Sequence, residues 1–299
     1  MALVTFSQFL SVIEIRTKIV SVSSFGLGTL FAATVVPLDP LLTTLMALAV
    51  LAVDMGTTAF NSFFDFMRRV DTNDFARERE KVLLHEGVPP GAALIIAGGL
   101  FAIAVALGLI LSFLVGLEVA VIGAVSMLVG FLYTGGPRPL STTPFGELFA
   151  GGFLGSVLFL LSAYIHTGFV SRELFLSSLP SLFLVASILA VNNACDREGD
   201  KAAGRKTLAI LLGGERGPYL IYLLGALAFG AAFASLPTEP FHYPILGVTL
   251  FVSAGIFVSM HRRGYRHETK LSSMGSISQI FLLYTLAAAI ILLHRSTTA

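Results

Sequence analysis

Long apolar stretches dominate this sequence and constrain its fold more than any other feature. A helix needs about 20 consecutive, mostly apolar residues to cross the hydrocarbon core of a bilayer. Nine windows of suitable length occur, at residues 19–36, 41–63, 92–112, 117–134, 147–166, 173–193, 217–236, 243–261 and 277–294. Lipid admits only helices or closed barrels, and the alternating pattern of barrel strands is absent. We therefore predict an all-α integral membrane protein, a bundle of nine transmembrane helices.

The composition agrees with this class and excludes several others. Of the 299 residues, 55% are hydrophobic and only 12% are charged, against about 25% charged in soluble domains. The net charge of +1, with no basic tract apart from the connections, predicts no nucleic-acid partner. The single cysteine, Cys195, excludes an intrachain disulfide. Residues 1–18 lack the pattern of a cleaved signal peptide, and we expect a short interfacial helix there.

The distribution of basic residues predicts the orientation. If the N-terminus and every second connection lie on one side, that side holds all but two of the 19 Lys and Arg residues. The exceptions are Arg172 and Arg295. Cytoplasmic connections carry such an excess. We expect a single transmembrane domain over residues 1–299 in the inner or cell membrane, a cytoplasmic N-terminus, and cytoplasmic catalytic loops at 64–91 and 194–216.

Two polar motifs interrupt the apolar pattern, at the ends of the second and sixth windows. The first motif, in "NSFFDFMRRVD", consists of Asn61, Asp65 and Asp71, and the second, in "NNACDREGD", of Asn192, Asp196 and Asp200. In each motif the amide and the first carboxylate are four residues apart and share one helical face. Four spans separate the two motifs, so both should emerge on the cytoplasmic side.

Four carboxylates gathered at one membrane face would repel one another without a cation. Hard oxygen ligands of this kind suit Mg²⁺, which commonly bridges carboxylates to substrate phosphate. The expected metal ligands are Asn61, Asp65, Asp71, Asn192, Asp196 and Asp200. Lys81, Arg205 and Lys206 follow the motifs and would neutralise phosphate charge. The other charges near the first motif, at Arg68, Arg69, Arg77, Glu78, Arg79 and Glu80, are better explained as solvated loop residues.

A polar stripe leads along the second window to the first motif. Asp54, Thr58, Asn61 and Asp65 advance by four, three and four residues, and therefore share one helix face. An ionised Asp54 inside the membrane costs on the order of 3 kcal/mol. Two interpretations stay open: Asp54 lines a substrate cavity or supports Asn61, or it is neutral, hydrogen-bonded and merely packed.

These motifs resemble those of the UbiA superfamily of intramembrane prenyltransferases, which has nine transmembrane helices and two aspartate-rich motifs. Three local matches resemble its 1,4-dihydroxy-2-naphthoate polyprenyltransferase branch: "VDT" at 70–72, "YTGGPRPL" at 133–140 followed by "GELF" at 146–149, and "NNACDREGDKAAGRKTLAILLG" at 192–213. The N-terminal element "RTKIV" at 16–20 keeps Arg16 and Lys18 but lacks the family's proline, and "KVLLHEG" at 81–87 places Lys81 at a phosphate-facing position.

The resemblance implies Mg²⁺-dependent transfer of a polyprenyl group from an isoprenyl diphosphate to 1,4-dihydroxy-2-naphthoate, giving demethylmenaquinone, diphosphate and CO₂. It implies catalytic roles for Asp65, Asp71, Lys81, Asp196 and Asp200. Diphosphate binding would fall to Asn61, Lys81, Arg138, Arg205 and Lys206. The acceptor or prenyl cavity would involve Asp54, Thr58, Tyr133, Asn192 and Asn193, with membrane lipid around the bundle.

Two kinds of alternative remain at the level of sequence. Another acceptor is compatible with the same motifs: 4-hydroxybenzoate, chlorophyllide, haem or an archaeal glycerol lipid. A cation-coupled transporter should carry its acids near the bilayer midplane. In this sequence four acids lie at helix ends, and only Asp54 lies deep within a predicted span. Prenyl length and oligomeric state are left open.

Overall fold

The structure is a computed structural model, and it describes residues 4–68, 83, 87–236 and 238–298. Its described residues form helices and no strand, which confirms the all-α prediction. The chain divides into two compact units. Unit 1 comprises Met1–Val22 and Thr44–Thr142, and unit 2 comprises Ser23–Thr43 and Thr143–Ala299.

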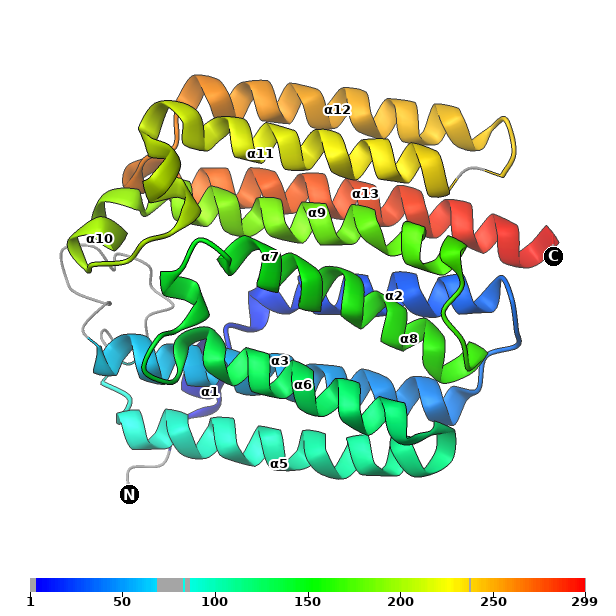
Figure 1. The fold of residues 1–299 in the computed structure, drawn as a ribbon, viewed down its shortest axis with the longest axis horizontal. Helices are drawn as coiled ribbons and strands as arrows, with labels where there is room; N and C mark the ends of the chain where they lie inside the picture. The colour runs from blue at the N-terminus through cyan, green and yellow to red at the C-terminus, as the bar shows by residue number, and fades with distance from the viewer. Residues whose placement is uncertain (1–3, 69–82, 84–86, 237, 299) are drawn as a thin grey trace. The chain divides into compact units, whose positions relative to one another are not determined.

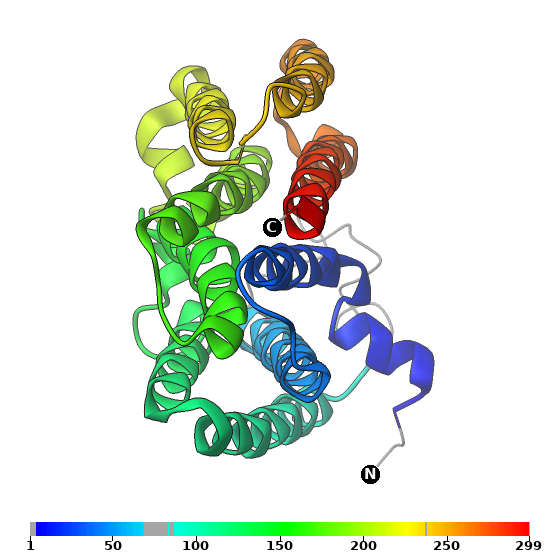
Figure 2. The same cartoon turned by 90° about the vertical axis from the view of Figure 1, so that its right-hand side faces the viewer.

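Unit 1 is built on three long helices that lie side by side (Figure 1; end-on in Figure 2). They are α3 (Pro40–Met67, whose first residues belong to unit 2), α5 (Pro90–Val115) and α6 (Leu117–Thr134). Shorter elements complete it: α1 (Phe6–Val12), η1 (Ile15–Lys18), the first turn of α2 (Ile19–Ala33) and η2 (Leu140–Thr142). Ala59 and Phe60 of α3 and Ala93 and Ala97 of α5 are buried in one hydrophobic cluster, which joins the two helices through their side chains.

The N-terminal segment runs antiparallel to α3 within unit 1. Ser62 donates a hydrogen bond to the carbonyl of Val12 at 3.4 Å, whereas Ser21 reaches Asp54 two turns earlier on α3. The chain changes direction at Glu14, which adopts a left-handed conformation with φ 46°. The N-terminal segment therefore enters unit 1 at the end of α3 that carries the first motif.

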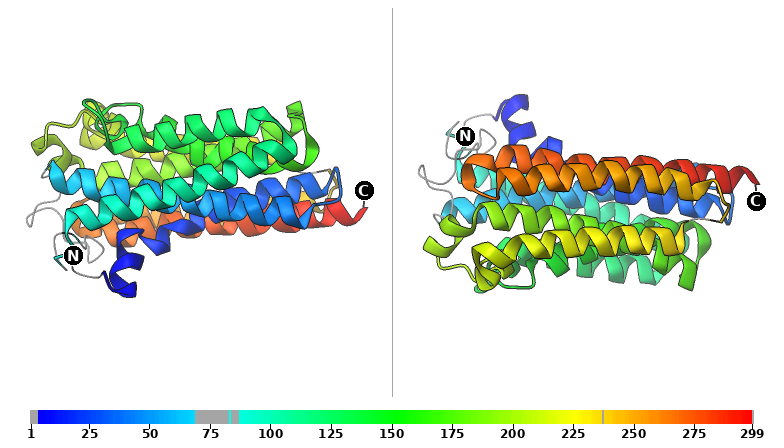
Figure 3. Two further views of the ribbon diagram at one scale, coloured as in Figure 1. Left: turned by 90° about the horizontal axis from the view of Figure 1, so that it is seen from below. Right: turned by 90° about the horizontal axis from the view of Figure 1, so that it is seen from above.

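Unit 2 is centred on α9 (Arg172–Cys195), which packs against α11 (Leu208–Ser235), α13 (Lys270–Thr298) and η3 (Gly151–Val157). The other elements are the remainder of α2, from Ser23, the first residues of α3, α7 (Gly146–Ala150), α8 (Leu158–Thr167), α10 (Arg197–Ala202), α12 (His242–Arg263) and η4 (His267–Thr269). Figure 3 shows α12 beside α13, to which η4 connects it. This topology places the end of α9 and the start of α13 at one end of unit 2.

A π-helix, η3, replaces α-helical geometry in the middle of the fifth predicted span. Gly151 and Gly155 bring it against the backbone of α9, and a Cβ at Gly155 would lie 2.6 Å from the Cα of Leu182. Ser156 and Ser178 share a buried hydrogen bond of 2.6 Å across the same contact. Small residues thus set the spacing of η3 and α9, as they do in membrane helix pairs generally.

Eight helices of the described chain are long and apolar enough to cross a membrane. They span Pro40–Met67, Pro90–Val115, Leu117–Thr134, Gly146–Thr167, Arg172–Cys195, Leu208–Ser235, His242–Arg263 and His267–Thr298. Each overlaps a predicted window. The remaining window, 19–36, contains α2, whose 15 residues extend only about 22 Å at 1.5 Å per residue. The count of nine therefore depends on how α2 and the segment before it traverse the bilayer.

Candidate functional site

The first motif lies on the last turns of α3, where Asn61 and Asp65 are both half-buried. The Oδ1 atom of Asn61 accepts a hydrogen bond of 2.7 Å from the hydroxyl of Thr134, the last residue of α6. Asp71 and Lys81 lie outside the described residues. The contact with Thr134 fixes the orientation of the Asn61 amide and joins the motif to the end of α6.

Arg68 makes a second connection between these two helix ends. Its guanidinium donates to the backbone carbonyls of Thr134 and Gly136 and lies over the ring of Phe64, 5.6 Å from the centroid. Gly136 has φ 75°, a conformation that favours glycine, so the chain can turn there. Arg68 is exposed, as expected for a solvated loop residue, and it also holds the 134–136 segment beside the first motif.

The same connection carries two further candidates, Tyr133 and Arg138. Tyr133 is half-buried in the last turn of α6, and Arg138 is exposed. The guanidinium of Arg138 is therefore exposed two residues after Gly136, the last of the Arg68 contacts.

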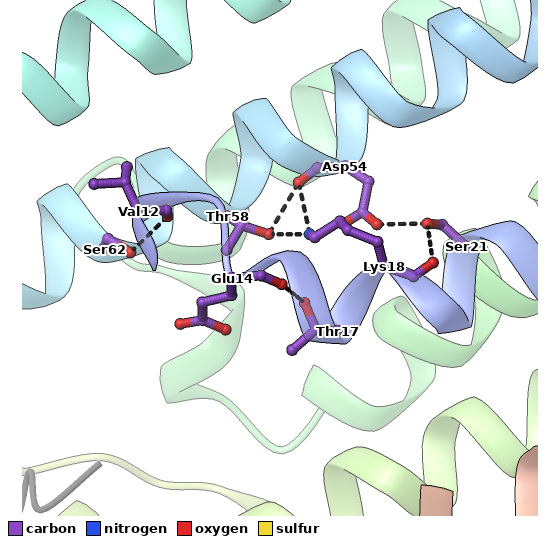
Figure 4. A network of polar contacts seen from close by, with 8 residues as sticks. All are labelled: Val12, Glu14, Thr17, Lys18, Ser21, Asp54, Thr58 and Ser62. Atoms are coloured by element: carbon purple, nitrogen blue, oxygen red, sulfur yellow. Dashed lines mark hydrogen bonds and ion pairs between the residues drawn. The ribbon is translucent and has the colours of Figure 1, made fainter. Parts of the chain in front are cut away.

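Below the first motif, Asp54 takes part in a buried polar network (Figure 4). The ammonium of Lys18 lies 2.7 Å from Asp54 Oδ1 and 2.7 Å from the hydroxyl of Thr58, and 3.4 Å from the carbonyl of Asp54. Ser21 donates to Asp54 Oδ2 at 2.5 Å. Thr58 donates to the carbonyl of Asp54 at 2.9 Å. Asp54 is thus hydrogen-bonded, as one of the two interpretations required, but its main partner is a cation that the sequence did not identify.

This network positions the stripe that leads to the first motif. Lys18 is only 3% exposed, and its three ammonium protons have three acceptors on α3. Because one ammonium touches both Asp54 and Thr58, the shared face predicted for these two residues is confirmed. Asn61 follows Thr58 by less than one turn.

The second motif spans the end of α9 and the first four residues of α10, Arg197–Asp200. Asp196 ends α9, and its backbone N–H donates to the carbonyl of Asn192. Asp200 is buried, and its Oδ1 atom lies 3.1 Å from Nη1 of Arg205. Gly204, with φ 75°, turns the chain so that the backbone N–H of Arg205 also reaches the carbonyl of Asp200 at 2.9 Å. One acid and one predicted phosphate-binding cation are therefore brought together.

The carboxylate of Asp196 is held by the connection between α12 and α13. Lys270 Nζ lies 2.6 Å from Oδ2, and His267 Nδ1 lies 3.5 Å from Oδ1. Tyr265 is in the same connection, where burial and its hydrogen bond with Tyr222 raise the pKa of its phenol. Tyr265 therefore stays a neutral hydroxyl at physiological pH.

The remaining residues predicted for this site have different surroundings. Asn192 is half-buried, and Lys206 is exposed. Asn193 is buried and donates to Oε1 of Glu147 on α7 at 2.9 Å. Glu147, in the "GELF" segment, thereby orients the second amide of the "NN" pair.

Sequence reasoning missed Lys18, Thr134, Glu147, His267 and Lys270. Lys270 contributed only to the orientation bias, and Lys18 also to the "RTKIV" element. Nothing local marks a contact with Asp54, 36 residues on, or with Asp196, 74 residues back. Thr134 and Glu147 stand inside "YTGGPRPL" and "GELF", so the resemblance to the family's local motifs was the available signal.

The donor set of both motifs fits magnesium. Their side chains offer only carboxylate and amide oxygens, the ligands of Mg²⁺. In unit 2 the carboxylates of Asp196 and Asp200 are neutralised by Lys270 and Arg205, which are also cations suited to phosphate. Within either unit, no three described His, Cys, Asp or Glu side chains form a group that could hold a metal alone. Substrate phosphate or water would have to complete the coordination.

Solved structures define the class of protein to which this fold belongs. A UbiA homologue from Archaeoglobus fulgidus, described as bound to DMAPP and Mg²⁺, superposes with a TM-score of 0.66 at 16% identity, covering 94% of this chain and 98% of that one. At this identity the likeness establishes the fold. The eight apolar helices, together with the family model that matches residues 21–285, indicate an integral membrane protein.

The sequence comparisons identify the family. Residues 21–285 match the UbiA prenyltransferase family, and the chain belongs to it. A 1,4-dihydroxy-2-naphthoate octaprenyltransferase of Bacillus subtilis is 39% identical over 203 residues, which are 68% of this chain and 65% of the relative. The enzyme of the same name from Mycobacterium tuberculosis is 29% identical over 66% of this chain and 67% of its own length. The match thus spans about two thirds of these relatives.

Proposed function

We propose that the protein transfers a polyprenyl group from an isoprenyl diphosphate to 1,4-dihydroxy-2-naphthoate, in a reaction that requires Mg²⁺. The pair of motifs at the ends of α3 and α9, in a chain of this family, is the observation that carries the proposal. The choice of acceptor is supported by the 39% identity to the Bacillus subtilis relative of that name. The other acceptors considered above are outcomes of the test below.

In the proposed reaction the bond between the prenyl carbon and the diphosphate oxygen breaks, and a bond to the ring carbon that carries the carboxylate forms. The carboxylate leaves as CO₂ and its electron pair restores the aromatic ring. No oxidant takes part, so the ring is released as the hydroquinone, which gives demethylmenaquinone on oxidation. Mg²⁺, when bound, would stabilise the negative charge that develops on the leaving diphosphate.

The chain's own residues would bind and orient the diphosphate. Asn61, Asp65 and Asp71 would hold the metal from the first motif, and Asn192, Asp196 and Asp200 from the second. Lys81, Arg138, Arg205 and Lys206 would bind phosphate oxygens, an arrangement of cations prepared for a developing anion. Tyr133, Asn193, Thr58 and Asp54 would border the acceptor or prenyl cavity. The apolar helices would exclude water, which would otherwise capture an allylic cation.

We also propose nine crossings, a cytoplasmic N-terminus and a cytoplasmic site. The excess of Lys and Arg on one side supports this orientation. In unit 1, the N-terminal segment enters at the end that carries Asn61 and Asp65, because Val12 contacts Ser62. The chain would then start on the side of the first motif, cross once to reach the start of α3, and cross back through α3 to the motif.

The proposal is tested by product analysis. Purified protein in lipid is supplied with Mg²⁺, a polyprenyl diphosphate and a panel of aromatic and lipid acceptors, and the products are identified by mass spectrometry. We expect prenylated, decarboxylated product from dihydroxynaphthoate. Prenylation of a different acceptor from the panel would correct the acceptor, and no prenyl transfer to any acceptor would refute the proposed activity.

The metal requirement is tested with the same assay. EDTA, Asp65→Asn and Asp196→Asn should each lower product formation by at least about 100-fold, equivalent to about 2.7 kcal/mol in the barrier. Glu118→Gln, which removes an exposed carboxylate at the opposite end of α6 from Thr134, serves as the matched control. Product formation that survives EDTA would refute the role of the two motifs as a metal site.

A further inference from the structure

The connection between α12 and α13 contributes a basic residue to the second motif that has no role in the proposal above. Lys270 is the first residue of α13, and its ammonium lies 2.6 Å from Oδ2 of Asp196. Its side chain is only 12% exposed, so the contact is largely shielded from solvent. His267, in the same connection, lies near the other oxygen of the same carboxylate. One connection thus covers both oxygens of Asp196.

The position of Lys270 is unfavourable for a cation on local grounds. The N-terminus of a helix carries a partial positive charge, which favours an acidic residue and disfavours Lys by several tenths of a kcal/mol. The 29-residue helix α13 begins with Lys270, directly after η4, whose acidic residue Glu268 precedes Lys270 by two positions. The ammonium of Lys270 contacts Asp196, at the end of another helix. The anion it contacts is one of the residues we assign to the metal site.

We infer that Lys270 is a diphosphate-binding residue. This inference rests on the proposed function. In the ligand-free chain the ammonium neutralises Asp196, and when that carboxylate binds metal, the ammonium passes to a phosphate oxygen of the isoprenyl diphosphate. Mg²⁺ commonly binds a carboxylate and a substrate phosphate together, so the two groups would be neighbours at such a site. A cation in contact with the carboxylate is therefore within reach of the phosphate as well.

The alternative is that Lys270 only anchors the connection to the end of α9. The two roles predict different binding behaviour. An anchoring lysine would affect metal and diphosphate binding together, through the position of Asp196. A phosphate ligand would affect diphosphate binding, whereas metal binding without diphosphate would be unchanged or tighter, because a competing cation has been removed.

Equilibrium dialysis with labelled inorganic diphosphate and Mg²⁺ tests the inference on the purified full-length protein. We expect Lys270→Gln to weaken diphosphate binding about tenfold, the loss of one charge-assisted hydrogen bond, and Lys270→Arg to retain binding within about threefold. Arg262→Gln removes the same charge from an exposed position near the end of α12 and should bind like the wild type. Should Lys270→Gln fail to fold, Lys270→Met, which keeps the aliphatic stem, takes its place.

Binding of Mn²⁺ without diphosphate, followed by electron paramagnetic resonance, provides the second measurement. Unchanged or tighter Mn²⁺ binding by Lys270→Gln supports the inference. Wild-type diphosphate affinity in that variant, or an equal loss of Mn²⁺ and diphosphate binding, would overturn it. These measurements use no acceptor, so a failure of the proposed acceptor chemistry leaves the assignment of Lys270 separately testable.

Discussion

The contact between Lys18 and Asp54 shows how a single pair of residues can hold the start of the chain against α3. Lysine is almost never fully buried unless it is paired. Here the pair is satisfied on both sides: Asp54 receives Lys18 on one oxygen and Ser21 on the other, and Thr58 accepts from the same ammonium. A closed network of this kind specifies one alignment of residues 18–21 along α3, because a slip of one residue would leave a charge buried and unpaired.

We predict that removing one partner is more harmful than removing both. Lys18→Met or Asp54→Leu alone leaves an uncompensated charge and should lower the free energy of unfolding by about 3–5 kcal/mol. The double variant, which leaves neither charge, should lose less than either single variant. Unfolding in mixed micelles, titrated with a denaturing detergent, measures all three free energies. Additive losses would show that the two side chains do not act as a pair.

For individual residues, the sequence predicted which side chains share a helix face but not which residues contact them. The spacing of Asp54 and Thr58 along one helix is a local property, and the structure confirms it through their shared contact with Lys18. The partners Lys18 and Lys270 belong to other helices, and the packing that brings them in leaves no trace in local spacing. The roles of the two motifs in metal binding stay predictions.

Among the helices, hydropathy located the spans well and their ends less well. The window 117–134 coincides with α6. The window 277–294 began too late, because α13 starts at Lys270 and includes the polar run "KLSSMGS". There Arg263 donates to Ser276 at 2.6 Å, and Ser273 is fully buried. Protein contacts, not lipid, stabilise these turns as helix, and a hydropathy window cannot detect such contacts.

The start of α11 departs from the prediction for a different reason. The window began at residue 217, yet helical structure begins at Leu208. Gly213, with φ 78°, interrupts it, so residues 208–212 form a short separate helical segment. A segment of this length is too short to stand out as a membrane span.

The contact between η3 and α9 gives a prediction at the scale of elements. Gly155→Ala places a methyl group 2.6 Å from the backbone of α9, so the two helices must separate, and we expect a loss of about 1–3 kcal/mol. Gly152→Ala is a matched control three residues away in the same helix, because a Cβ there meets nothing within 4 Å. Helix propensity alone favours Ala over Gly by up to about 1 kcal/mol, so the control should be neutral or stabilised.

Thermal unfolding of both variants in the same detergent provides the comparison. A lower midpoint for Gly155→Ala, with an unchanged or higher one for Gly152→Ala, is the expected result. Equal midpoints would show that η3 and α9 adjust to the added methyl group, and that glycine does not set their spacing.

For the whole molecule, the number of crossings depends on the N-terminal 33 residues. The eight helices that follow α2 alternate in direction across a bilayer if each crosses once. The connection before α3 then lies opposite the first motif. The α2 helix is short for a span, but η1 and the end of α1 precede it, and Val12 lies beside Ser62 near the far end of α3. A broken segment from α1 to α2 can therefore complete the crossing that α2 alone cannot.

The location of the N-terminus decides between eight and nine crossings. A fluorescent protein that fluoresces only in the bacterial cytoplasm can be fused to the N-terminus. We expect this fusion to fluoresce, because we place the N-terminus in the cytoplasm. In a variant with Cys195 replaced by Ser, single cysteines at Leu117 or Val170, both exposed at helix ends, should react with an impermeant maleimide in intact cells. A cysteine at Ala202, on the exposed side of α10, should react only after lysis. An N-terminus on the same side as Leu117 would mean that α2 does not cross. Reaction of Ala202 in intact cells would instead reverse the whole orientation and place the second motif outside the cytoplasm.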